Sequence, residues 1–142
     1  MPGLQFASHE AVRRLGEPLP PESIYFVNAC DPASVCGLAI EGLSTALPRR
    51  LASHWLVFHA SQLLLVLQKS GKELSVIGEP APAILENALG IYRFLLGREA
   101  VPQSSITVET INGQNASTSR FADLFRAIGF ASDYRGMSLW KR

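Results

Sequence analysis

The chain has 142 residues, which is enough for one domain that buries roughly 68–70% of its unfolded surface without metals or disulfides. Hydrophobic residues make up 47%, charged residues 18%, and the net charge is +1, so the basic excess of a free-standing nucleic-acid binder is missing. No apolar run reaches the roughly 18 residues of a membrane span, and the N-terminus lacks a signal-peptide pattern. We therefore expect a cytoplasmic protein with no membrane contact, in which Cys30 and Cys36 stay as thiols.

The N-terminal segment predicts a short helix that begins after Ser8, a good N-cap residue, and ends at Gly16. Prolines at 18, 20 and 21 then predict a stiff connector. Residues 1–20 are accordingly expected to form a helix and linker, and residues 21–142 the domain itself.

Apolar runs predict the next strands. Residues 24–27 form the first run, and residues 33–53, with frequent Gly, Ser and Pro, are expected to be mostly loop. Three further runs at 55–58, 63–67 and 74–77 are separated by hairpin-sized turns, which favours an antiparallel meander.

A helix over 62–69 is the alternative for the middle run, because leucine is a poor strand former. The length of the run and its flanking turns favour the strand. After Pro80 and Pro82, which suit a first helical turn, a wide apolar stripe predicts a helix over 82–96. Clean alternation then predicts a strand over 106–111.

Asn112 and Gly113 follow this strand and form the strongest short hairpin signal, yet the sequence shows no second strand after them. Instead a hydroxyl-rich spacer leads to Ser119, which is expected to cap a helix over 119–128. Gly129 is expected to end this helix in a Schellman motif that Phe130 closes.

A short strand over 137–140 ends the chain. The elements together predict an α+β fold: an antiparallel, barrel-like or strongly curved sheet with two packed helices and a short N-terminal helix. The helix over 119–128 is expected to cover an open end or edge of the sheet.

Patterns for catalysis or metal binding are few. His54 and His59 are five positions apart and would face opposite sides of a strand, and the cysteine spacing differs from that of zinc or redox motifs. No phosphate-binding glycine motif, nucleophile elbow or carboxylate pair is present. The sequence predicts no catalytic residue, no metal site and no cofactor for this chain.

Basic residues are the remaining candidates. Arg49 and Arg50 in a loop, and Lys69 and Lys72 at a turn, are expected to contact the phosphates of single-stranded DNA, although solvated surface charge is the simpler interpretation. Trp55 or Trp140 would stack on bases if exposed. With a net charge near zero, binding is expected to be weak.

The segment "VETINGQNASTSRFADLFRAIGF" followed by "DYRGMSLWKR" resembles the C-terminal signature of the Lhr (large helicase-related) family of DNA helicases. Three upstream stretches are similar to that family as well, so the resemblance extends over nearly the whole chain: "LQFASHEAVRRL", "NACDPASVCGLAI" and "LLLVLQKSGKEL". The first is similar to the segment that leaves the winged-helix module of the family.

The resemblance implies that this chain is a piece of a larger protein that contains ATPase domains, a winged helix and this barrel-like module. Proteins of that family couple ATP hydrolysis to 3′-to-5′ movement on single-stranded DNA. ATP and Mg²⁺ would belong to those ATPase domains, whose motifs this chain lacks. We expect a non-catalytic accessory domain whose partners are the helicase core, the winged helix and single-stranded DNA. A free-standing interaction or oligomerisation module is the alternative, and an enzyme with a hidden pocket is a third.

Overall fold

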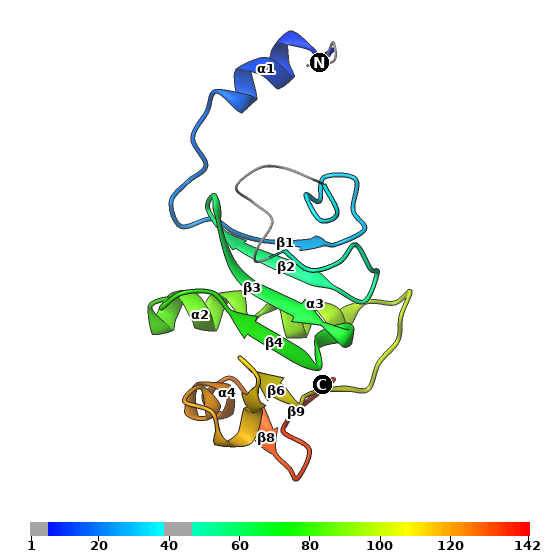
Figure 1. Cartoon of the computed structure of the whole chain (residues 1–142), viewed down its shortest axis with the longest axis vertical. Helices are drawn as coiled ribbons and strands as arrows, with labels where there is room; N and C mark the ends of the chain where they lie inside the picture. Colours follow the sequence, from blue (N-terminus) through cyan, green and yellow to red (C-terminus); the bar gives the residue numbers. More distant parts are fainter. Residues whose placement is uncertain (1–5, 39–46) are drawn as a thin grey trace.

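The computed structural model describes residues 6–38 and 47–142 and has an α+β fold (Figure 1). Within these residues the helical segments are α1 (His9–Leu15), η1 (Lys69–Gly71), α2 (Pro82–Ala88), α3 (Ile91–Gly97), η2 (Ala116–Thr118) and α4 (Ala122–Ala127). The strands are β1 (Ile24–Asn28), β2 (Trp55–His59), β3 (Gln62–Gln68), β4 (Glu73–Val76), β5 (Ser105–Val108), β6 (Thr110–Ile111), β7 (Gln114–Asn115), β8 (Ala131–Ser132) and β9 (Met137–Trp140).

The strands form two sheets. The larger has the order β1-β2-β3-β4-β6-β7, and the smaller has the order β5-β9-β8. All neighbours are antiparallel except β4 and β6, which are parallel. Among the described strands no closed barrel is formed, so the fold is established as a mostly antiparallel α+β arrangement.

The predicted meander is confirmed, and the alternative helix over 62–69 is wrong because residues 62–68 form β3. Two tight turns make the meander possible. Ala60 and Ser70 adopt positive φ angles of 51° and 59°, which reverse the chain within a few residues. The expected loop over 33–53 has no helix or strand in its described parts, and residues 39–46 lie outside the described residues.

The prediction of one continuous strand over 106–111 is wrong. β5 ends at Val108 and pairs with β9 in the small sheet, whereas β6 begins at Thr110 and pairs with β4 in the large sheet. Glu109 lies between them, and its backbone N–H donates to the carbonyl of Lys72 at 2.7 Å. The chain therefore changes sheets at Glu109, and this change places Ile111 rather than Thr110 in the core.

A hairpin does form at Asn112 and Gly113, contrary to the expectation that no second strand follows them. Thr110 pairs with Asn115 across a two-residue turn whose φ angles are 51° and 78° at Asn112 and Gly113. Asn112 is also held to the large sheet, because its Oδ1 accepts the backbone N–H of Val76 at 2.8 Å. Sequence alternation missed β7 because a strand of two residues is too short to alternate.

The single helix predicted over 82–96 is also wrong, because the chain forms α2 and α3 with Leu89 and Gly90 between them. Hydrogen bonds of the tighter i→i−3 type run through this junction, from Gly90 to Asn87 and from Tyr92 to Leu89, both at 3.1 Å. The bend lets α2 pack on β1 and β2 while α3 reaches β5.

The C-terminal helix is shorter than predicted. α4 spans Ala122–Ala127, with Phe121 at the cap position, and the 3-10 turn η2 occupies the spacer before it. Ser119 joins the two, since its hydroxyl donates to the carbonyl of Ala116 at 2.9 Å and accepts the N–H of Phe121 at 3.3 Å. Ser119 therefore organises the start of the helix without occupying its N-cap.

The predicted Schellman end of α4 is confirmed. Gly129 has a φ of 105°, and its N–H donates to the backbone carbonyl of Arg126 at 3.1 Å. The N–H of Phe130 donates to the backbone carbonyl of Phe125 at 3.0 Å, which is the second hydrogen bond of the motif. This turn directs the Phe130 ring into the core.

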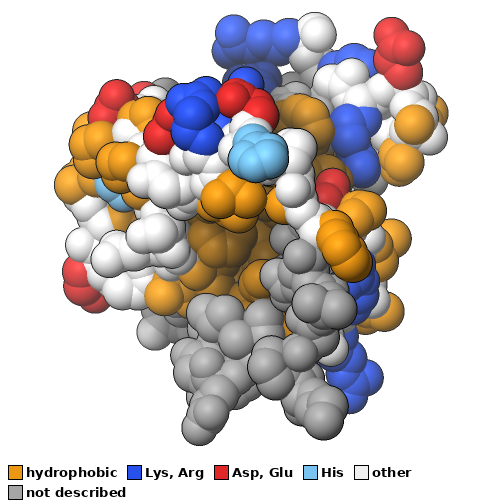
Figure 2. Space-filling view, turned by 90° about the horizontal axis from the view of Figure 1, so that it is seen from above, with side chains coloured by type: hydrophobic (Ala, Val, Ile, Leu, Met, Phe, Trp, Pro, Cys, Tyr) orange, Lys and Arg blue, Asp and Glu red, His pale blue; other side chains and the backbone are white. Residues whose placement is uncertain are grey.

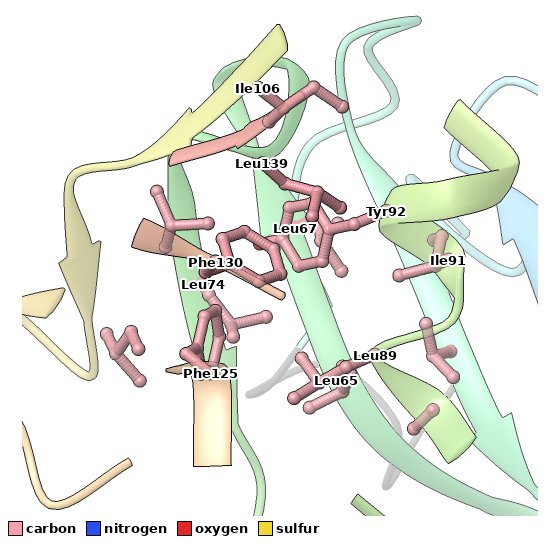
Figure 3. Close-up of a cluster of buried hydrophobic side chains, with 14 of the residues drawn as sticks. Leu65, Leu67, Leu74, Leu89, Ile91, Tyr92, Ile106, Phe125, Phe130 and Leu139 are labelled. Carbon is pink, nitrogen blue, oxygen red and sulfur yellow. The ribbon is translucent and has the colours of Figure 1, made fainter. Parts of the chain in front are cut away.

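An aromatic cluster joins the two sheets to the helices (Figure 3). The ring centroids of Tyr92 and Phe130 lie 5.4 Å apart, and those of Phe125 and Phe130 lie 4.8 Å apart. The hydroxyl of Tyr92 donates to the carbonyl of Gly71 at 3.1 Å in the interior. Burial raises the pKa of Tyr92 far above its ordinary value, so this hydroxyl stays a donor.

The predicted N-terminal helix is confirmed as α1, with Ser8 accepting the N–H of Ala11 at 3.1 Å. None of its residues is buried, and in Figure 1 the helix stands apart from the sheets at the end of an extended connector. Figure 2 shows basic and acidic side chains interspersed on the face seen from that end, around an apolar hollow beside residues that are not described. Within the described residues, no helix has the length and apolar content needed to cross a membrane.

Candidate nucleic-acid interface

Arg49 and Arg50 lie in the loop that leads into β2, and within the described residues only the side chain of Arg50 forms hydrogen bonds to the protein. The guanidinium of Arg50 donates to the carbonyls of Asp31 at 3.1 Å and Cys36 at 3.4 Å, so this side chain organises the loop around those residues. Arg49 is exposed and forms no ion pair with an acidic residue of the described ranges. Of the two, Arg49 is the better candidate for phosphate contact.

Lys69 and Lys72 lie at the turn between β3 and β4, and both have acidic neighbours. The ammonium of Lys69 is 2.5 Å from the carboxylate of Glu73, and this hydrogen bond raises the pKa of Lys69. Lys72 is 3.7 Å from the carboxylate of Glu109, a longer and solvent-exposed pair. Because its ion pair is longer, the ammonium of Lys72 is less engaged than that of Lys69 and can contact a ligand more readily.

The tertiary structure brings the two predicted basic pairs to the same end of the large sheet. The backbone N–H of Ser70, between the lysines, donates to the carbonyl of Ser53 at 2.8 Å. Ser53 follows the arginine loop and precedes β2. The four basic residues that the sequence analysis selected thus lie on neighbouring segments.

A polar groove of about 170 Å³ continues from this turn toward the small sheet. Its lining residues come from the turn, from β5 with its flanks, and from the β8–β9 loop: Ser70, Lys72, Gln103, Ser105, Ile106, Thr107, Glu109 and Arg135. Two cations, one carboxylate and several hydroxyl or amide groups therefore face a single groove. Such a set suits a ligand that carries both negative charge and hydrogen-bonding groups.

Three polar side chains are linked beside this groove. The Thr107 and Ser138 hydroxyls are 2.8 Å apart, and the Ser138 hydroxyl donates to Oδ2 of Asp133 at 2.9 Å. Oδ1 of the same carboxylate accepts the N–H groups of Arg135 at 2.7 Å and Gly136 at 3.0 Å. The Arg135 N–H is the main cause, and the Ser138 hydroxyl the next, of a lowered pKa at Asp133.

We expect Asp133→Asn to change the pH dependence of stability. Because the folded-state pKa is lowered, the stabilisation is complete above the unfolded-state pKa of about 3.9 and is lost as the pH falls through the folded-state value. The variant should therefore be less stable than the wild type at pH 7, and this difference should shrink toward pH 2. Urea unfolding at a series of pH values measures it.

Asp123→Asn is the control, because the Asp123 side chain is 96% exposed on the surface of α4. A difference between wild type and Asp133→Asn that stays constant from pH 7 to pH 2 would contradict the role given to the Asp133 carboxylate.

Two exposed aromatic residues are direct neighbours of groove residues, one across the sheet and one along the chain. Trp140 is 52% exposed and pairs across β5 with Ser105, so its side chain is on the sheet face that carries Thr107 and Ser138. Tyr134 is 85% exposed, and its hydroxyl oxygen accepts a hydrogen bond from Nε of Arg135 at 2.8 Å. Trp55, by contrast, is buried and has the guanidinium of Arg98 over its ring at 5.2 Å. Of the two tryptophans, only Trp140 is accessible for stacking.

A larger cavity of about 340 Å³ lies between the α2–α3 junction and β9, and it is the less suitable candidate. Its floor is apolar, with Leu89, Phe130 and Leu139 among its lining residues. Its cation, Arg93, donates to the backbone carbonyls of Ile128 and Trp140, both at 3.4 Å, and so holds α3 to the C-terminal segments.

Sequence reasoning missed Thr107, Ser138 and Asp133 as members of a site. Alternation did place Thr107 on the face of its strand opposite Ile106 and Val108, and these two residues are buried. No sequence signal indicated that β5 pairs with β9, however, and only this pairing brings Thr107 to Ser138 and the following loop.

The histidines and cysteines do not converge. Nδ1 of His54 is 3.0 Å from the carbonyl of Arg49, and Cys30 and Cys36 are free thiols. In residues 6–38 and 47–142, no group of three His, Cys, Asp or Glu side chains is arranged to hold a metal ion.

Comparison with protein-family models finds none that matches this chain, and comparison with curated proteins also finds no match.

Proposed function

We propose that this chain is a non-catalytic accessory module of an Lhr-type DNA helicase, and that it contacts single-stranded DNA through the polar groove. The observation that carries the proposal is the exposed Trp140 beside a groove that contains Lys72 and Arg135. The resemblance of residues 108–142 to the Lhr signature supports the same conclusion, since this segment includes β9 and the loop before it.

The chemistry of the groove suits a single strand. An exposed indole can stack on any base, and aromatic stacking contributes about 1–3 kcal/mol per base. Lys72 and Arg135 can each approach a phosphate, and Arg49 extends the basic surface from the neighbouring loop. Glu73 and Glu109 lie among these cations and reduce the local field, which is consistent with weak binding by the isolated domain.

The helicase core and winged helix of a parent protein would be the protein partners, and ATP and Mg²⁺ would bind to that core. The module would act in the cytoplasm. The large and small sheets together would serve as the barrel-like wall of a channel around the strand.

Replacing Trp140 by alanine tests the proposal. We expect affinity for a fluorescently labelled 12-nucleotide DNA strand to fall about 5- to 150-fold, the range that corresponds to the loss of one stacked base. Fluorescence anisotropy measures the affinity. In the wild type, three phosphate contacts, by Lys72, Arg135 and Arg49, predict a slope of log K against log salt of about −2.1, and Lys72→Ala or Arg135→Ala should reduce its magnitude by about 0.7.

Phe6→Ala is the matched control, because Phe6 is 93% exposed but precedes α1, away from the groove. Arg50→Ala should alter the loop near Asp31 and Cys36 more than the salt slope, whereas Arg49→Ala should reduce that slope. Equal affinities of wild type and Trp140→Ala, or no binding at low salt, would contradict the proposal.

A free-standing interaction module is the second candidate, and exposed apolar side chains near the N-terminus favour it. Phe6, Leu15 and Val12 are 93%, 84% and 59% exposed, so α1 and the residues before it present an apolar surface that the other described residues leave uncovered. Sedimentation of the pure protein separates the candidates: self-association that Leu15→Glu abolishes, without DNA binding, would favour this second function.

A further inference from the structure

Thr107 lies at the end of a hydrogen-bonded chain whose direction can be worked out. The chain runs from Thr107 through Ser138 to Asp133, with oxygen separations of 2.8 and 2.9 Å. Ser138 is only 2% exposed, whereas Thr107 is half-buried and lines the groove. Water therefore has little access to the middle of the chain, and the protein itself determines how the hydroxyl protons are placed.

The direction follows from the carboxylate. An ionised carboxylate only accepts hydrogen bonds, so Ser138 must donate its one hydroxyl proton to Asp133. The oxygen of Ser138 can then only accept in its contact with Thr107. The single hydroxyl proton of Thr107 is consequently engaged, and its oxygen presents lone pairs to the groove.

We propose that Thr107 is a specificity-determining residue that accepts a hydrogen bond from a base or a ribose hydroxyl of the bound strand and makes no phosphate contact. This inference rests on the proposed function of the groove. The oxygens of an ionised phosphate offer no proton and would meet the lone pairs of Thr107. Base amino and imino groups, and the ribose 2′-hydroxyl, are the donors that a strand can supply.

The groove thus divides its tasks between residues. Lys72 and Arg135 have only donors in their side chains and suit the phosphates. Thr107, on the groove-lining strand β5, suits the base or ribose, which carries hydrogen-bond donors. Such a contact distinguishes among nucleotides, whereas the phosphate contacts do not.

The variant Thr107→Val tests this assignment, because valine keeps the branched shape on β5 and removes the acceptor. Three 12-nucleotide strands serve as probes: DNA, RNA of the same sequence, and an abasic DNA strand. We expect the variant to weaken binding of at least one base-containing strand about 3- to 10-fold, with no change in the salt slope. Thr107→Ser should restore the affinity, and Thr110→Val is the matched control outside the groove.

The three probes separate the two possible donors. A base donor predicts equal losses for DNA and RNA and no loss for the abasic strand, whereas a ribose donor predicts a loss for RNA alone. Unchanged affinities for all strands in a folded variant, or a loss accompanied by a smaller salt slope, would overturn the role of Thr107 while leaving the nucleic-acid function intact. Absence of binding by the wild type to any strand would overturn both.

Discussion

Replacing Gly136 by alanine is expected to lower the free energy of unfolding by at least about 3 kcal/mol. A Cβ at this position would lie 2.0 Å from the carbonyl oxygen of Val108 and 3.0 Å from Cα of Glu109, so the backbone itself would have to move. Gly136 also has a φ of 154°, a conformation that residues with side chains rarely adopt. Urea unfolding at pH 7 measures the loss.

Gly113→Ala is the matched control. Gly113 also has a positive φ, 78°, but apart from its two chain neighbours no heavy atom of the described residues lies within 4 Å of the position its Cβ would take. This variant should lose only about 1 kcal/mol, from backbone strain alone. Similar losses at both positions would mean that the close approach of Gly136 to Val108 contributes little to stability.

The second large effect is expected for Phe125→Ala, which should cost about 3–5 kcal/mol. The Phe125 ring is fully buried and lies 4.8 Å from Phe130 and 6.4 Å from Tyr92, measured between ring centroids. Removing it leaves a cavity where α4, the small sheet and α3 meet (Figure 3). A loss of this size is a large fraction of the stability of a typical domain. Urea unfolding of the variant should therefore be measured at low temperature.

Phe94→Ala provides the comparison, because Phe94 is 45% exposed on α3 and packs at 5.6 Å against Trp55. Its loss should be about 1–2 kcal/mol, in proportion to the smaller area that leaves water. If Phe94→Ala proves as destabilising as Phe125→Ala, the cluster around Tyr92 is not the main core of the domain.

Local patterns were sufficient for several elements. The apolar runs and turn residues of the meander predicted β2, β3 and β4, because each strand and its turn lie within a few residues of one another. Ser8 at the start of α1 and Gly129 at the end of α4 were identified for the same reason. Cap and turn geometry depends on one or two residues and their immediate neighbours, so distant packing does not alter it.

Predictions failed where distant segments compete for the same residues. Alternation treated residues 106–111 as one strand, but β9 and β4 each pair with one part of it, and the chain bends at Glu109 to satisfy both. The apolar stripe over 82–96 likewise indicated one helix, yet its two halves cover different surfaces, and the junction at Leu89 and Gly90 tightens between them.

The candidate site shows the same division. The basic residues, the alternating strands and the tight turns could be identified from local patterns alone. Three features became apparent only in the folded protein: Trp140 is exposed while Trp55 is buried, backbone carbonyls hold Arg50, and Thr107 meets Ser138. Exposure and hydrogen-bond partners depend on pairing between strands about 30 residues apart, and such pairing is selected by the packing of the whole core rather than by any local pattern.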